Sequence, residues 1–436
     1  MAAVSSGGTV RVAAGSYAEG TEYWSIVKSL SLIGAGSGLV TIDRSGSGSY
    51  GLHVEADDVT LQGFTFIGPS AVANWAYGLK IAHASHIALQ DVTVTGSGRS
   101  GIDLNGCSGV SLTDVTVTGN QGAGLALTSC SNVAVTGLVT GGNGWGGVAL
   151  FTSGSGITIT GSQLTWEPSA GVYVQGGTAL DYRAFNLSGN TFASNGVHFA
   201  DLVPGSLDLE DVLGHNTFDR AVVVRTGGEI SVPVVFCSIQ QAVDCAQPGD
   251  TVDVAPGTYR EQVVINKDLT LTGRPGAVVE APDAPATFRL PETSKTLQPV
   301  VLAFGGTRYE GNNISGDGTV TVNVAGLTVD GRNLVPTAQR SVGILYRNAS
   351  GDIEGNTVQN MYVDGKETFG ILVYGDSQVH VAQNHVSGWA RGGIAACGDF
   401  GTSGSGPLPD PVERGHRVRL ARDRVVRLRH HRRVHR

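Results

Sequence analysis

Residues 101–120 read GIDLNGCSGVSLTDVTVTGN, and residues 124–143 repeat the pattern as GLALTSCSNVAVTGLVTGGN. Both segments have a leading glycine, a cysteine six residues later and pairs of apolar residues at alternate positions. Alternation of apolar and polar residues is typical of a β-strand with one buried face. Self-similarity at a fixed period indicates an architecture in which each repeat is one structural unit.

The repeat extends over the first half of the chain. Its anchor glycines are Gly51, Gly78, Gly101, Gly124, Gly147 and Gly171, with spacings of 27, 23, 23, 23 and 24 residues. Short strands with turns at a constant place favour one coil per repeat, with equivalent strands stacked in parallel about 4.8 Å apart. A leucine-rich repeat fits poorly because no helical segment separates the strands. The pattern therefore predicts an all-β solenoid, the parallel β-helix.

A second starting signal lies past the middle of the chain, where residues 238–265 read SIQQAVDCAQPGDTVDVAPGTYREQVVI. Ser238 and Gln241 match a helix N-cap and its partner three residues later. The expected apolar face of this short helix consists of Ile239, Ala242, Val243 and Ala246. Such a helix can cover the apolar end of a solenoid. Because residues 249–259 also resemble residues 7–17, we expect two tandem units, the second with an N-terminal cap helix.

These signals divide the chain into a first unit (residues 1–233), a second unit (234–405) and a basic tail (406–436). We expect the first unit to lack most of its cap, and further residues with a signal peptide to precede it. A Pro-rich stretch at 281–299 is expected to be a loop. The tail shows no repeat pattern and is interpreted as disordered or frameshifted; a basic tail for nucleic acid or membranes is the alternative.

Composition narrows the function classes. The 64 glycines compare with roughly 30 expected from average usage. Residues 410–436 hold 10 of the 29 basic and 3 of the 37 acidic residues, which leaves 19 basic and 34 acidic residues, a net charge of −15, in residues 1–409. This charge argues against a nucleic-acid partner. The sequence has no run of 18 apolar residues that predicts a membrane span and no cysteine–histidine cluster that predicts a zinc site.

The segment 238–265 resembles the N-terminal cap and first coil of pectin-lyase-like, right-handed parallel β-helix proteins, which include pectinesterases and many secreted repeat proteins. The resemblance covers about residues 5–220 and 238–400 and is carried by capping and turn residues, which are specific for fold rather than activity. It implies a right-handed parallel β-helix, an extracellular or cell-surface location, and a polysaccharide or other glycan as partner. No cofactor is implied beyond the Ca²⁺ of calcium-dependent lyases.

The catalytic motifs of the enzymes that the chain resembles are missing. Of a pectinesterase-type Gly-Arg-Pro-Trp segment only residues 273–275 are present, without the Trp. Of the polygalacturonase motifs only Asp57-Asp58 is present, and a turn explains this pair more simply. Asp91 and Asp114 share a repeat position and are weak candidates for a Ca²⁺ site. A solvated ladder of turn residues is the simpler interpretation of these two aspartates.

Aromatic and basic residues that precede the anchor glycines are the candidate substrate-binding residues. They are Trp75, Tyr77, Arg99, Trp145, Trp166, Trp389 and Arg391. We expect them on one turn flank of the coils, where rings can stack on sugar faces and arginine can hold the carboxylates of acidic sugars. The alternative is that the rings pack over turns and shield the sheet edge.

The five cysteines leave their redox state open. Cys107 and Cys130 occupy equivalent positions one coil apart, within disulfide range, although a reduced inward ladder explains them equally well. Cys237 and Cys245 flank the expected cap helix and would lie about 12 Å apart if both belonged to it, too far for a bridge. Cys397 has no evident partner in the sequence.

The sequence therefore predicts a secreted or cell-surface carbohydrate-binding β-helix protein without a recognisable catalytic motif. One alternative is a polysaccharide lyase, glycoside hydrolase or carbohydrate esterase that acts on acidic polysaccharide through residues outside the known motifs. Another is a structural spacer or adhesin. Asn356 and Asn384 indicate only a ladder of asparagine turns that satisfies its own backbone, and no feature indicates an oligomeric state.

Overall fold

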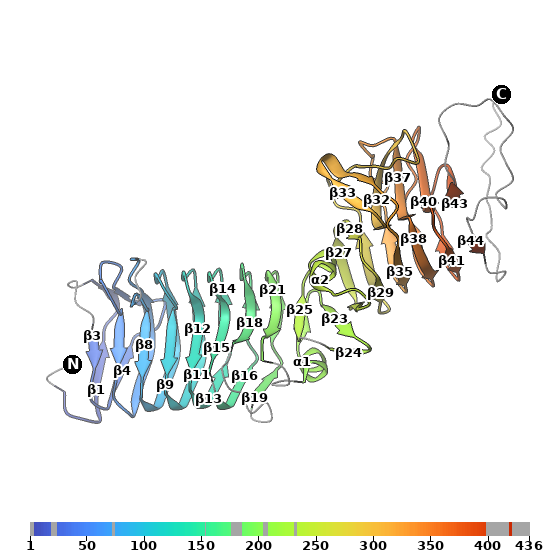
Figure 1. Cartoon of the computed structure of the whole chain (residues 1–436). Coiled ribbons are helices and arrows are strands. Elements are labelled where there is room, and N and C mark those ends of the chain that lie inside the picture. The colour runs from blue at the N-terminus through green and yellow to red at the C-terminus, as the bar shows by residue number, and fades with distance from the viewer. Residues whose placement is uncertain are drawn as a thin grey trace, which may run out of the picture. The chain divides into compact units, whose positions relative to one another are not determined.

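The computed structural model describes residues 4–18, 24–71, 75–152, 154–175, 185–203, 208–230, 233–397 and 418–420. The chain forms two compact units, the first from residues 1–219 and 231–237 and the second from residues 220–230 and 238–436. Each unit is a stack of coils built from short strands (Figure 1). The domain boundaries drawn from the sequence stay a prediction.

Each coil of the first unit contributes strands to three sheets. The sheet that follows the anchor glycines, here called the anchor sheet, contains β3 (Trp24–Ile26), β6 (Leu52–Val54), β8 (Leu79–Ala82), β10 (Ile102–Asn105), β12 (Ala123–Thr128), β15 (Gly146–Phe151), β18 (Ala170–Gln175) and β21 (Val197–Asp201). The second sheet contains β1 (Gly8–Val12), β4 (Leu30–Gly34), β7 (Val59–Ile67), β9 (Ser85–Thr95), β11 (Ser108–Thr118), β13 (Ser131–Thr136), β16 (Ser155–Thr160) and β19 (Phe185–Ser188). The third contains β2 (Gly15–Tyr17), β5 (Val40–Asp43), the ends of β7, β9 and β11, then β14 (Val139–Gly141), β17 (Gln163–Thr165), β20 (Thr191–Ala193) and β22 (Thr217–Phe218).

Successive coils pair in parallel with matching registers. Ile102 of β10 lies opposite Leu79 of β8 and Leu125 of β12, so the offset equals the 23-residue repeat on both sides. These three inward side chains are fully buried. The predicted strands, their parallel stacking and their inward apolar columns are therefore confirmed.

The anchor glycines are needed for close packing and not for an unusual backbone conformation. Gly101 does not have the positive φ that would favour glycine. A Cβ at this position would lie 2.3 Å from Val117 Cγ1 and 2.7 Å from Asn120 Nδ2. The missing side chain thus lets the turn residues and the third sheet approach the anchor sheet.

A ladder of buried amides satisfies the backbone at the turn that precedes the anchor sheet. Asn120 donates to Asn143 Oδ1, and Asn143 donates its backbone and side-chain N–H groups to Glu167. The Glu167 N–H in turn donates to Asn195 Oδ1. Burial raises the pKa of the Glu167 carboxyl, while the hydrogen bonds from Asn143 oppose that shift.

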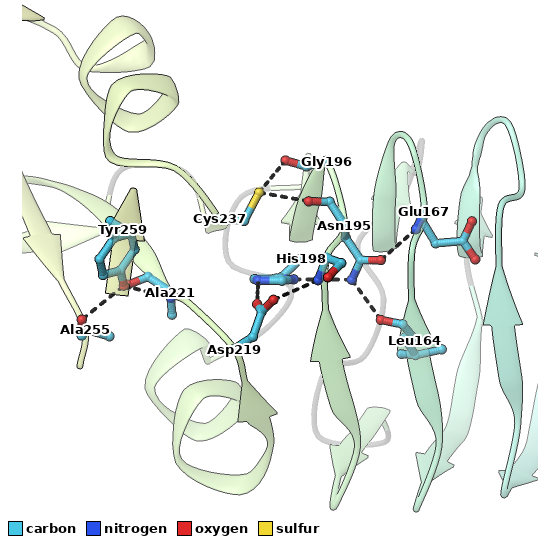
Figure 2. Close-up of polar contacts among 11 residues, drawn as sticks. Leu164, Glu167, Asn195, Gly196, His198, Asp219, Ala221, Cys237, Ala255 and Tyr259 are labelled. Carbon is cyan, nitrogen blue, oxygen red and sulfur yellow. Dashed lines mark hydrogen bonds and ion pairs between the residues drawn. The ribbon is translucent and has the colours of Figure 1, made fainter. Parts of the chain in front are cut away.

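Figure 2 shows how this ladder ends in the first unit. Asn195 Nδ2 contacts His198 Nδ1 at 3.2 Å, and His198 Nε2 lies 2.8 Å from Asp219 Oδ1. Because an amide nitrogen only donates, this contact leaves the imidazole proton on Nε2, facing the Asp219 carboxylate. Cys237 donates to the carbonyls of Asn195 and Gly196. His198 is fully buried, so we interpret the network as the closing element of the ladder.

Further elements complete the first unit. Helix α1 (Leu209–His215) packs near β19, with Asp208 as its N-cap, and β25 (Val234–Phe236) pairs antiparallel with β21. No helix among the described residues is long and apolar enough to cross a membrane.

The second unit begins as the sequence predicts. Helix α2 (Ile239–Cys245) has Ser238 as its N-cap, and its predicted apolar face is buried. Glu261 accepts hydrogen bonds from the N–H groups of Ile239 and Gln240 and from the Ser238 hydroxyl. A carboxylate at this end of a helix satisfies donors that have no partner within the helix.

The strands of the second unit again form three sheets. They are β26 (Thr251–Val254), β29 (Leu269–Gly273), β35 (Val320–Ala325), β38 (Ala349–Glu354), β41 (Val379–Ala382) and β44 (Val418–Leu420); β27 (Gly257–Arg260), β30 (Ala277–Glu280), β36 (Thr328–Asp330), β39 (Thr357–Gln359) and β42 (His385–Val386); and β28 (Val263–Ile265), β32 (Thr296–Phe304), β37 (Arg340–Arg347), β40 (Glu367–Tyr374) and β43 (Gly392–Cys397). Strand β23 (Val222–Thr226) pairs antiparallel with β26 and with β24 (Glu229–Ile230). The predicted asparagine ladder is confirmed, since Asn356 donates to Asn384 Oδ1. Apart from β44, the predicted tail at 406–436 lies outside the described residues.

The predicted loop at 281–299 is partly wrong, because Thr296–Pro299 belong to strand β32. Short elements stand on both sides of β32 in the sequence: β31 (Phe288–Arg289) before it, and β33 (Thr307–Tyr309), the 3₁₀ turn Glu310–Asn312 and β34 (Asn313–Ser315) after it. These flanking segments lie against the outer face of the sheet formed by β32, β37 and β40, where they bury an apolar cluster that includes Phe288, Leu345 and Leu372. Glu292, between β31 and β32, forms a buried ion pair with Arg347 of β37 at 2.6 Å, which holds this segment against the sheet.

Replacing Gly101 with alanine should destabilise the protein by about 1–3 kcal/mol, because the added methyl group overlaps Val117 and Asn120. Gly38→Ala is the matched control, since no atom lies within 4 Å of the position where its Cβ would be. Denaturant unfolding followed by circular dichroism measures both variants. Equal stability of the two would contradict the close-packing role of the anchor glycines.

Candidate functional site

The outer face of the first anchor sheet carries an unusual column of side chains. His53, Lys80 and Asp103 lie opposite one another on β6, β8 and β10, and Ala126 and Ala149 continue the column on β12 and β15. Each stands between two inward apolar residues of its strand, so alternation directs it outward. Charged groups and small apolar groups thus meet on one face.

Lys80 and Asp103 form an ion pair between neighbouring coils. Their side chains are only 10% and 8% exposed, although both lie on the outside of the coil. Removing two charges from water is expensive unless each is paired. Because Lys80 and Asp103 are buried although they point outward, other side chains must cover them.

A group of aromatic rings forms this cover on the N-terminal side. Tyr50 stacks on Tyr77 with centroids 6.2 Å apart, contacts Trp75 edge-on at 6.3 Å and lies 4.6 Å from the His53 ring. Lys80 Nζ lies 5.0 Å from the centroid of Tyr77. Trp75 remains 59% exposed, whereas Tyr77 is buried. The exposure of the rings thus increases from Tyr77, which is buried, to Trp75, which is largely exposed.

Arg99 connects this group to a second exposed tryptophan. Its guanidinium carbon lies 5.2 Å from the ring centroid of Tyr77 and 5.2 Å from that of Trp145. Backbone hydrogen bonds run from Trp145 to Gly122 and from Gly122 to Arg99, so glycine stands between them in the stack. Because Gly122 has no side chain, Trp145 can reach across one coil to Arg99.

These side chains make up what we call the outer-face cluster: Tyr50, His53, Trp75, Tyr77, Lys80, Arg99, Asp103 and Trp145. An apolar patch adjoins it, where Phe151 and Tyr173 pack against Ala126 and Ala149. The face therefore combines exposed rings with polar groups held in fixed positions, which suits a ligand with both apolar and hydroxyl-bearing surfaces.

Two ionisable groups of the cluster have shifted pKa values. Burial lowers the pKa of the His53 imidazole; the Glu55 carboxylate opposes this shift and the Lys80 ammonium adds to it. Neutral imidazole is therefore favoured at neutral pH. Burial, followed by the charge of Asp103, raises the pKa of the Tyr77 hydroxyl, so this group stays protonated and can donate a hydrogen bond.

The structure brings together four of the seven predicted binding residues, namely Trp75, Tyr77, Arg99 and Trp145. Trp166 is exposed, but it lies at the start of its turn, directly after β17, where its carbonyl accepts a hydrogen bond from the Gly142 N–H. Trp145 lies at the end of its turn, directly before β15.

Trp389 and Arg391 belong to the second unit, where Arg391 pairs with Glu367. Trp389 and Arg391 are therefore not assigned to the group around Arg99, which belongs to the first unit. Whether any of the seven binds a ligand stays a prediction.

The weak metal candidates occupy the bend between the second and third sheets. Asp91 and Asp114 have φ of 49° and 53°, the left-handed conformation that aspartate tolerates better than most residues. The Asp91 carboxylate accepts hydrogen bonds from the N–H and hydroxyl groups of Ser37. These observations favour the turn interpretation. Among the described residues no group of three or more His, Cys, Asp or Glu could hold a metal ion.

The cysteines within the described part of the chain are free thiols: Cys107, Cys130, Cys237 and Cys245. Cys107 and Cys130 donate to the carbonyls of Ile81 and Leu104, one coil before each. They therefore form the reduced ladder of the two alternatives. The side chain of Cys397 lies outside the described residues.

Tyr50, His53, Lys80 and Asp103 are not among the residues predicted from the sequence, because the predicted residues lie at turns and outward strand positions usually face solvent. One signal could have identified the ion pair. Lys80 and Asp103 are opposite charges one 23-residue repeat apart, and each is flanked by inward apolar residues. Register places such residues side by side.

Breaking the buried Lys80–Asp103 ion pair should lower the free energy of unfolding more than breaking an exposed ion pair does. Asp103→Ala leaves Lys80 without its carboxylate and should destabilise the protein by about 3–5 kcal/mol. The double variant Lys80→Met/Asp103→Leu should recover most of this loss. Asp283→Ala, which breaks an exposed pair with Arg332, serves as control and should cost less than about 1 kcal/mol. A double variant no more stable than Asp103→Ala would contradict the buried pair.

The chain was compared with curated protein sequences and with solved structures. No curated protein sequence matches the chain. Among solved structures, the chain is similar to the catalytic domain of a GH87 α-1,3-glucanase in complex with nigerose (13% identity, TM-score 0.33, 90% of this chain and 64% of that one). It is also similar to PfbA, a surface adhesin of Streptococcus pneumoniae (13%, TM-score 0.35, 90% and 85%), and to the pectate lyase Pel9A (13%, TM-score 0.27, 81% and 72%). None of these similarities carries an argument about activity.

The family comparison concerns the first unit. Residues 47–220 match the family model described as a right-handed β-helix region. This segment contains β6 to β21 and the whole outer-face cluster. With its parallel coils and inward apolar columns, the first unit is a parallel β-helix, and residues 47–220 match the right-handed form of this fold.

Proposed function

We propose that the first unit binds a glycan across the outer-face cluster and that the protein acts outside the cell or at its surface. The observation that carries this proposal is Arg99, held between the rings of Tyr77 and Trp145 beside the partly exposed Trp75. Apolar rings that gather on one exposed face commonly mark a binding surface. Sugar rings offer the apolar faces and hydroxyl groups that such a surface can hold.

Axial spacing supports the same proposal. Trp75 and Trp145 stand in turns three coils apart, which corresponds to about 14 Å at the spacing of parallel strands. This distance suits a ligand of several sugar rings rather than a single one. In the described part of the second unit, residues of β31 and β34 such as Phe288 and Ile314 cover the matching face of the sheet.

An enzyme is the second candidate, because the cluster contains ionisable groups that could move protons. His53 favours its neutral form and lies in register with Lys80. A polysaccharide lyase, glycoside hydrolase or carbohydrate esterase would produce unsaturated ends, reducing ends or released acyl groups. Incubation with a panel of polysaccharides, followed by assays for these products, separates an enzyme from a binding protein or a spacer.

Binding should depend on the two exposed tryptophans. Trp75→Ala and Trp145→Ala should each weaken retention of the best-bound polysaccharide about threefold to tenfold, because each removes one stacking surface. Affinity electrophoresis in polysaccharide-containing gels measures this effect. Tyr309→Ala, which removes an exposed ring from the second unit, is the matched control and should behave like the unmodified protein.

Two results would contradict the binding proposal. One is unchanged retention of both tryptophan variants. The other is an equal loss in Tyr309→Ala, which would point to nonspecific adsorption. Failure to bind any glycan would favour the spacer or adhesin alternative.

A further inference from the structure

We propose that the outer-face cluster takes a neutral glycan rather than an acidic one. This inference rests on the proposed function and specifies the class of ligand at the same site. It follows from how the charges of the cluster are already used within the protein.

The ammonium group of Lys80 is already paired with the Asp103 carboxylate. Both side chains are about nine-tenths buried, and each is the other's neighbour in register on β8 and β10. A carboxylate of an acidic sugar would have to compete with Asp103 for this cation, and it would also meet the negative charge of Asp103 at close range. Lys80 therefore offers little net attraction to an anion.

The guanidinium of Arg99 is enclosed by rings. Tyr77 and Trp145 each lie 5.2 Å from its central carbon. A cation placed over ring faces is stabilised there by their negative electrostatic potential. Arg99 therefore serves mainly to hold the Trp145 ring in place beside the buried ring of Tyr77.

The whole face is close to electrically neutral. Glu55 and Asp103 balance Lys80 and Arg99, and the partly buried imidazole of His53, 3.7 Å from Glu55, favours its uncharged form. The surrounding chain repels anions at longer range, since residues 1–409 carry a net charge of −15. The exposed groups of this face are the Glu55 carboxylate, which would repel an anion, and the rings of Trp75 and Trp145.

Salt dependence tests this inference on the full chain. Retention should be measured in gels that contain neutral polysaccharides (a β-glucan, an α-glucan, a galactomannan) or acidic ones (polygalacturonate, alginate), at about 0.05 M and about 0.5 M NaCl. We expect retention by at least one neutral polysaccharide, changed less than about twofold by salt. Acidic polysaccharides should give no retention.

A charge variant sharpens the test. Asp103→Asn frees the Lys80 ammonium and should create retention by polygalacturonate that disappears at high salt. Glu229→Gln makes the same change of net charge at an exposed position of the second unit and should create none. A folded Asp103→Asn protein without this gain would contradict the charge compensation. If that variant fails to fold, the unmodified protein alone decides the question.

The outcomes separate the two proposals. Retention of the unmodified protein by acidic polysaccharide, with an affinity that falls as salt rises, overturns this inference and leaves the proposed function standing. Retention by neither class overturns the proposed function and this inference with it. Retention by neutral polysaccharide alone, insensitive to salt, supports both.

Discussion

Hydrogen bonds between successive coils hold equivalent residues of each repeat about 4.8 Å apart. Every other feature of the first unit depends on this register. It aligns Ile102 with Leu79 and Leu125 in the interior, and it places Lys80 against Asp103 on the outside. A shift by one residue would exchange the two faces and expose the interior column. Parallel pairing thus determines both the core and the surface chemistry.

Two devices keep this register at the turns. The buried ladder of Asn120, Asn143 and Glu167 gives the turn backbone fixed partners from coil to coil, and the anchor glycines leave room for it. Left-handed residues such as Asp91 bend the chain between the second and third sheets. Because each device repeats with the coil, side chains at the turns also stand in fixed columns. Trp145 can therefore reach Arg99 over Gly122 without any specialised loop.

The sequence was sufficient to predict the strands, the inward columns, the cap helix after Ser238 and the ladder at Asn356, because each follows from spacing within one helix or from the repeat period. Trp75, Tyr77, Arg99 and Trp145 of the cluster were predicted because they lie within three residues of an anchor glycine. The ion pair was missed because outward strand positions usually face solvent and carry little information. The predicted loop at 281–299 includes the first four residues of β32, Thr296–Pro299, because Pro299 makes the beginning of this strand look like a loop. Tertiary pairing with β37 overrides that local signal.

The central claim is that a glycan lies across the outer-face cluster of the first unit. Hydrogen–deuterium exchange of the full chain, with and without a retained oligosaccharide, tests this claim most directly because it reports the location of binding. The account predicts slower exchange at residues 50–54, 75–80, 98–104 and 144–150, which carry the cluster on four separate coils. Protection confined to the second unit, or to the opposite sheets of the first, would contradict it.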